Sequence, residues 1–317
     1  MKRIVLLATL ATVFIAGCVT PQIPFIAPQP TVVAGAGLTI TDFSVDPSEV
    51  YSTSTARVLM TVDNLGGSVA SDSNSMVMLI GSALKLDDTT GMYWSNPSET
   101  IFKHFGKDMK PADPVREIPA DTKTFTWSLT APNVSKGQMN DYIFIGRVYY
   151  DYQSSVSGTI WVYSQSEADA ARAAGRTLNK ATFSAISAPV SLTVKATPDP
   201  VVLAPGENKF TLIITVSNVG GGTLYKKGAV DYTTGSENVE LTTDELNRVD
   251  ISITAPGMTI PATCTGEQEL IGGKDLKIVC DVTVDTPPTT FQGYPITIKA
   301  DYGYFTERTA SVSVSGR

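Results

Sequence analysis

The chain has little of what enzymes use for chemistry. It contains one histidine, His104, and three cysteines among 317 residues. No Gly-x-Ser-x-Gly elbow, His-Glu-x-x-His motif or phosphate-cradling glycine loop occurs in it. We therefore expect a protein that is not an enzyme and carries no cofactor, and we interpret His104 as an ordinary loop residue.

Charged residues are also scarce. They make up 17% of the chain, and the formal net charge is -7 at pH 7. Binding to nucleic acid needs a basic surface that displaces counterions, so nucleic acid is excluded as a partner, as is electrostatic adhesion to anionic lipid. Valine, threonine, serine, glycine and tyrosine are abundant instead, a composition that favours strands and turns. We expect an all-β fold.

No apolar run reaches the ~20 residues of a membrane-spanning helix. The N-terminal run, residues 4–15, follows Lys2 and Arg3 and ends at Ile15-Ala16-Gly17-Cys18. This pattern predicts a signal peptide over residues 1–17. Its end resembles the lipobox of secreted lipoproteins, which implies cleavage before Cys18 and lipid on its thiol. The alternatives are an ordinary signal peptide with an incidental cysteine, or an uncleaved anchor.

Residues 18–37 contain four prolines, at positions 21, 24, 28 and 30. Proline removes amide donors and favours extended chain, so we expect a tether that holds the folded part off the membrane. An edge strand of the first domain is the alternative, which proline disfavours because it interrupts ladder pairing.

The rest of the chain repeats itself at an offset of 152 to 154 residues. Asp46-Pro47 recurs as Asp199-Pro200, and the strand that ends in Asn64-Leu65-Gly66-Gly67 recurs before Asn218-Val219-Gly220-Gly221. Tyr150-Asp151-Tyr152 likewise recurs as Tyr302-Gly303-Tyr304. Four markers in one order, the fourth pairing 118–129 with 270–281, indicate two copies of one domain.

Each copy has the pattern of an antiparallel β-sandwich. Apolar residues alternate with polar ones over residues 56–64 and 209–218, as in a strand with one buried face. Asparagine and glycine, which tolerate positive φ, then allow the chain to reverse. We predict two tandem immunoglobulin-like sandwiches, at 38–163 and 189–317, joined by a linker with a short helix at 164–188.

These markers resemble the CARDB-type and related immunoglobulin-like modules of archaeal and bacterial surface proteins. The resemblance implies adhesion, spacing or envelope assembly, with an envelope or surface protein or a polysaccharide as partner. The chain departs from the simplest module in two longer segments, 81–117 and 226–269, which have room for a specific site.

Two cysteines remain if Cys18 carries lipid. Cys264 and Cys280 form an even remainder in an exported chain, which favours a disulfide between them. Two buried free thiols, or a metal pair, are the alternatives. One histidine and no further cysteine leave a zinc site incomplete, so no metal is expected.

The linker carries the one convincing helical pattern. Ser166 is the expected cap, alanines are frequent over residues 168–174, and Gly175 supplies a stop. The alanine surface is expected to lean on a neighbouring sandwich and fix the angle between the domains. A solvated spacer is the alternative.

Two further features are candidate sites. Aromatic residues in a long loop supply contact area at low entropic cost, so a partner-binding segment is predicted at Tyr93, Trp94, Phe102 and Phe105. Packing over the open end of the first sandwich is the alternative for these four. Asn133-Val134-Ser135 is the one unblocked glycosylation sequon, predicted to face solvent. The oxygen-rich run Asp72-Ser73-Asn74-Ser75 lacks the glycine pattern of a calcium loop.

Three hypotheses about function follow. The first is a lipid-anchored protein of the cell surface, facing the exterior, whose sandwiches adhere, space or scaffold. The second is a lipoprotein that binds a ligand or partner through the aromatic segment. The third is a hydrolase hidden in the two longer segments, which the missing motifs disfavour.

Overall fold

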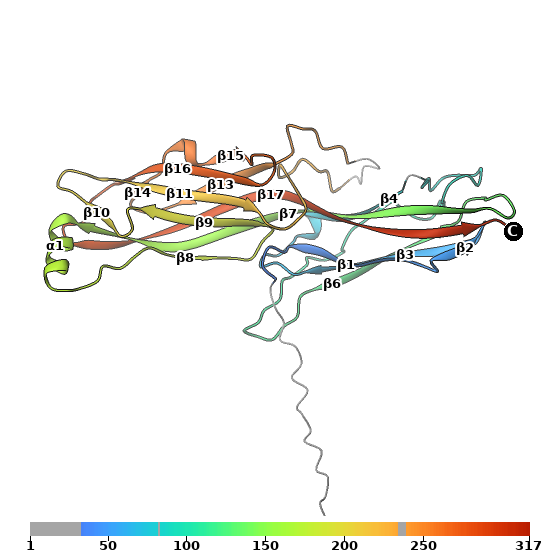
Figure 1. Cartoon of the computed structure of the whole chain (residues 1–317), viewed down its shortest axis with the longest axis horizontal. Coiled ribbons are helices and arrows are strands. Elements are labelled where there is room, and N and C mark those ends of the chain that lie inside the picture. Colours follow the sequence, from blue (N-terminus) through green and yellow to red (C-terminus); the bar gives the residue numbers. More distant parts are fainter. Residues whose placement is uncertain (1–32, 82, 234–238) are drawn as a thin grey trace, which may run out of the picture.

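The computed structural model describes residues 33–81, 83–233 and 239–317. The predicted signal peptide, Cys18 and most of the predicted tether lie outside these residues. The described chain is an all-β protein of antiparallel sheets with one short α-helix (Figure 1). This confirms the predicted fold class.

Three sheets contain the strands. The first sheet has the order β1 (Leu38–Asp46), β3 (Thr55–Asn64), β6 (Thr122–Thr130). The second has the order β14 (Met258–Thr259), β16 (Asp275–Val284), β11 (Lys209–Asn218), β9 (Val190–Thr197). The third has the order β15 (Gly266–Glu269), β13 (Arg248–Thr254), β17 (Phe291–Ser315), β7 (Met139–Ser164), β4 (Ser75–Gly81), β5 (Phe102–Lys103). The short strands β2 (Glu49–Tyr51), β8 (Thr182–Ala185), β10 (Val201–Leu203) and β12 (Thr223–Tyr225) pair with β7 or β17.

Two long strands, β7 and β17, run the length of the molecule (Figure 1). They pair antiparallel without a break from Phe291 opposite Tyr163 to Ser315 opposite Met139. Each long strand therefore contributes to both sandwiches. In the first half of the molecule the β1-β3-β6 sheet packs against β4, the start of β7 and the end of β17. In the second half the β9-containing sheet faces the remaining parts of the long strands.

The predicted domain boundaries need correction for this reason. One sandwich does not lie wholly within either predicted range, 38–163 or 189–317. The reason is that half of the last long strand of each copy belongs to the sandwich of the other copy. The repeat reflects a pseudo-twofold arrangement. Asp151 pairs with Gly303, and these residues are also equivalent in the repeat, so the pseudo-axis passes between them. We call this central region the waist.

The same hydrogen-bonded lock closes each half beside the waist. Tyr304 Oη donates to Asn218 Oδ1 at 2.8 Å and accepts the Gly222 N–H at 2.7 Å. In the first half Tyr152 Oη donates to the Ser68 carbonyl at 2.8 Å, lies 3.3 Å from Asn64 Oδ1 and accepts the Ser68 N–H at 2.9 Å. The Asn-x-Gly-Gly motif thus serves mainly as a polar clamp on the Tyr-x-Tyr motif.

Glycine is needed in the motif for close approach. A Cβ on Gly66 would stand 2.2 Å from Tyr152 Oη, and one on Gly220 would stand 2.7 Å from Tyr304 Oη. The asparagines themselves do not adopt positive φ. The expected reason for this motif, a turn that tolerates positive φ, holds at Gly221, which has a φ of 73°. At Gly66 and Gly220 the reason is different, because the tyrosine hydroxyls occupy the space where side chains would be.

The disulfide between Cys264 and Cys280 is present. Cys280 lies on β16, and Cys264 ends the 3-10 turn Ala262–Cys264, so the bond links this turn to the β14-β16-β11-β9 sheet. Both side chains are buried.

The helix α1 (Gln165–Ala173) lies at the far end of the second half (Figure 1). It continues directly from β7. Its N-cap is Ser164, not the predicted Ser166, and the Ser164 Oγ accepts the Glu167 N–H at 3.3 Å. Ala168 and Ala171 are buried against the sandwich, which favours the leaning helix over the solvated spacer. The helix covers one end of the molecule and does not set an angle between two domains.

Candidate functional site

The two longer segments meet on the outer face of the shared sheet. They cover a second apolar cluster, separate from the main core, which we call the outer cluster: Met76, Met78, Tyr149, Tyr225, Val230 and Tyr232. Ile101 and Phe102 from the first copy and Val239 and Leu241 from the second pack on it. The segments therefore build one shared surface beside the waist, which their separate positions in the sequence did not indicate.

A buried polar network anchors the outer cluster to the pseudo-axis. Tyr232 Oη donates to Asp151 Oδ1 at 2.9 Å and lies 2.7 Å from Tyr225 Oη. Burial raises the pKa of Asp151 above its usual range, an effect that the hydrogen bond from Tyr232 opposes. Gly303, the repeat equivalent of Asp151, leaves room for the Tyr225 ring, which a Cβ would meet at 2.0 Å. The network fixes the second copy's segment over the shared sheet.

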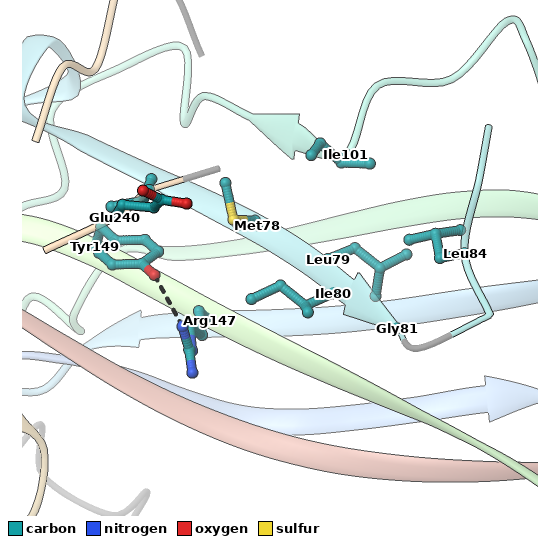
Figure 2. Close-up of a pocket in the computed structure, with 10 residues that line it drawn as sticks. Met78, Leu79, Ile80, Gly81, Leu84, Ile101, Arg147, Tyr149 and Glu240 are labelled. Carbon is teal, nitrogen blue, oxygen red and sulfur yellow. Dashed lines mark hydrogen bonds between the residues drawn. The ribbon is translucent and has the colours of Figure 1, made fainter. Parts of the chain in front are cut away.

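A pocket of about 330 Å³ opens beside this cluster (Figure 2). Apolar side chains line most of it, including Met78, Ile80 and Ile101, and Arg147, Tyr149 and Glu240 supply its polar groups. Figure 2 shows the Tyr149 hydroxyl turned toward Arg147, at 3.2 Å from Nη1.

The positive charge of Arg147 is already paired within the protein. Its Nε lies 2.7 Å from Glu307 Oε2, and its guanidinium lies 5.1 Å from the centre of the Phe305 ring. Burial lowers the pKa of Arg147, but hydrogen bonds to Tyr149 and Glu307 outweigh it and leave the pKa raised. Among the described residues that line it there is no histidine, cysteine or serine. The pocket can take a small apolar group.

The predicted aromatic contact segment is divided by the structure. Trp94 and Phe105 are each 1% exposed. Trp94 packs edge-on against Phe144 at 5.4 Å between ring centres, and Phe105 packs against Phe125 at 5.1 Å. These two residues are core, so their assignment to a contact surface is corrected. Tyr93 remains exposed, and Phe102 is half-buried on the outer cluster.

The loop with Asp72 uses its oxygens internally. Asp72 Oδ1 accepts the Gly106 N–H at 2.8 Å, and Asp108 Oδ1 accepts the Asp72 N–H at 2.9 Å. Among the described residues no cluster of histidine, cysteine and carboxylate side chains is suited to a metal ion. His104 is exposed, and its ring lies 6.0 Å from that of Phe102. Its surroundings give it no evident chemical role.

Asn133 is exposed, beside the turn at Gly91, whose carbonyl accepts the Asn133 N–H at 2.7 Å. Its glycosylation stays a prediction. No helix within the described parts of the chain has the length and hydropathy to cross a membrane.

Comparisons with known proteins give little beyond this geometry. No protein-family profile matches the chain, and no curated protein sequence matches it. Similar solved structures include the D0-D1 domain of intimin, at 11% identity and a TM-score of 0.20, covering 87% of this chain and 98% of that chain. Another is the collagen adhesin (CNA) from S. aureus, at 10% identity and a TM-score of 0.11, covering 91% of this chain and 96% of that chain. Likenesses this weak carry no argument about function.

Proposed function

We propose that the chain is a lipid-anchored protein of the cell exterior, whose fused sandwiches form a stiff scaffold or adhesion module. The observation that carries this proposal is the pair of long strands shared by both halves. A paired register of this length corresponds to roughly 80 Å at about 3.3 Å per residue. A continuous sheet resists bending where a flexible linker between two domains would not.

The contacts of Val33, where the described chain starts, favour a molecule attached at its middle over one attached at one end. The Val33 N–H donates to the Leu65 carbonyl in the first half at 2.9 Å, and its carbonyl accepts the Ser187 hydroxyl of the second half at 2.6 Å. The tether predicted from the prolines thus joins the folded part at the waist. A molecule held there presents both ends sideways, which suits scaffolding or adhesion better than spacing.

The anchor is proposed to be lipid at Cys18, and the partner a protein or polysaccharide of the cell envelope. The Cys18→Ser chain should leave the membrane fraction, and the mature wild-type chain should begin at a lipid-modified cysteine in intact-mass measurements. Unchanged fractionation together with an unmodified N-terminus would refute the anchor. The resemblance to CARDB-type modules remains part of this proposal.

Ligand binding through the aromatic segment is the weaker alternative. Trp94 and Phe105 are core residues, so the accessible remainder is Tyr93 and Phe102. The pocket of Figure 2 is the specific observation that keeps a small apolar ligand under consideration. Met78→Trp would fill that pocket, and unchanged attachment of this variant to cells would separate the two proposals.

A further inference from the structure

One edge of the shared sheet is covered in the second half of the molecule and open in the first. In the second half, β8 pairs with residues 156–159 of β7. The repeat equivalent of that segment is residues 308–311 of β17. Among the described residues, no strand pairs with this part of β17 on the side away from β7.

The limits of the open edge are sharply defined. Toward the waist, Thr223 of β12 pairs with Phe305, and toward the end of the molecule the Ser313 N–H donates to the Ser48 carbonyl at 2.9 Å. Backbone groups of alternate residues face the same side of a strand. The backbone groups of Glu307, Thr309 and Ser311 therefore face the open edge.

A groove lies next to the waist end of this edge. It encloses about 410 Å³ and is lined by Thr39 and Ile40 of β1, the glycines 220–222, and residues 305–308 of β17. Arg308 reaches from the edge to β1, where its Nη1 donates to the Thr41 carbonyl at 2.9 Å. No carboxylate of the described residues forms a salt bridge with Arg308, and Glu307, which lines the same groove, pairs with Arg147, so the Arg308 guanidinium is available to a partner's carboxylate.

The chain's own upstream residues are poorly suited to the edge. Residues 30–33 correspond to β8 in the repeat, and Pro30 takes the place of Thr182. The Ile186 N–H donates to the Ser155 carbonyl of β7 at 3.0 Å. Thr182 lies four residues earlier, so its N–H faces the same side, toward β7. Proline has no N–H to donate there. Val33 is also bonded at the waist to both halves.

We propose that the edge of β17 from Thr306 to Ser311 binds an extended strand of a partner protein by β-augmentation. The strand runs antiparallel to β17, as β8 does to β7. It places a carboxylate beside Arg308 and a small side chain opposite Ala310. A large ring does not fit there, because Phe183 of β8 lies over Gly158, the repeat equivalent of Ala310, where a Cβ would stand 2.5 Å from that ring. An unprotected edge of this kind is otherwise an aggregation hazard. This site rests on the proposed surface role, for which the partner would be a protein that presents an extended strand.

The first test is amide hydrogen exchange on the full chain carrying Cys18→Ser. The amides of Glu307, Thr309 and Ser311 should exchange quickly in the free protein. Protection that does not depend on concentration would mean that the chain's own N-terminal segment covers the edge. Protection that rises with concentration would mean that a second copy covers it. Either result would overturn the proposal.

The second test uses a labelled peptide of residues 179–188 in which Ala185→Glu places a carboxylate opposite Arg308 and Phe183→Ala leaves room for the Ala310 side chain. Fluorescence polarisation should show binding, and bound peptide should protect the three amides. Thr309→Pro removes an edge N–H and should weaken binding roughly tenfold. Thr309→Ala, which keeps that N–H, should bind as wild type does. Arg308→Gln should weaken binding about threefold for this peptide and leave unchanged the binding of the matched peptide that has alanine at position 185.

Failure of the peptide to bind, or equal binding to Thr309→Pro, would overturn the proposed edge site. Neither result bears on lipid at Cys18, which cell fractionation tests separately.

Discussion

The shared strands predict that the two halves unfold together, and the disulfide offers a way to test this. The bond lies wholly in the second half, and its cysteines are separated by 16 residues. Closing a loop of this size stabilises the folded chain by about 3 kcal/mol in the chain-entropy account. Reduction should therefore lower the free energy of unfolding by that amount.

The reporters for this experiment lie in the first half. Trp94 and Trp127 are buried there, whereas Trp161 lies on the second-half part of β7. In a Trp161→Phe background, tryptophan fluorescence reports the first half alone, and far-ultraviolet circular dichroism reports the whole chain.

Both signals should shift by the same amount on reduction, roughly 6 °C at about 2 °C per kcal/mol for a chain of this size. The reason is that unfolding the second half removes the strands against which β7 and β17 pack, and the paired rings of Tyr150 and Tyr304, 5.9 Å apart, lie at the waist. In the Cys264→Ala/Cys280→Ala variant, reductant should produce no shift. A fluorescence transition that stays in place while circular dichroism shifts would refute the coupling and restore two independent domains.

Three further predictions concern single side chains. Tyr304→Phe leaves Asn218 Oδ1 and the Gly222 N–H without their partner, and urea unfolding should show a loss of about 1–3 kcal/mol, against a change within about 0.5 kcal/mol for the exposed control Tyr93→Phe. Trp94→Ala should cost about 3–5 kcal/mol by the same assay, and a near-neutral result would contradict its assignment to the core. Asp151 has a folded-state pKa raised above 3.8, so it binds a proton more tightly when folded, and its contribution to stability is lost as pH rises through that pKa. Relative to Asp151→Asn, the wild type should therefore gain stability as pH falls toward 4, and an unchanged difference across that range would exclude the effect.

The sequence by itself determined the class of fold and the existence of the repeat. Alternating apolar residues specify strands with one buried face, as β3 and β11 show with Val58, Met60, Leu212 and Ile214 buried. The cysteine count predicted the disulfide, on the expectation that Cys18 carries lipid and leaves a single pair. The compositional argument for a short alanine helix also held, although its cap lies two residues earlier than expected.

The tertiary structure alone decided how the copies combine. Residues 139–164 and 291–315 contain no signal that distinguishes a strand serving one sandwich from a strand serving two, because alternation continues through the waist in either case. Whether Trp94 and Phe105 face solvent or core depends on which strand lies beside them, and that is a non-local choice. The outer cluster and the open edge of β17 arise in the same way, since each depends on residues of one copy meeting residues of the other across the pseudo-axis.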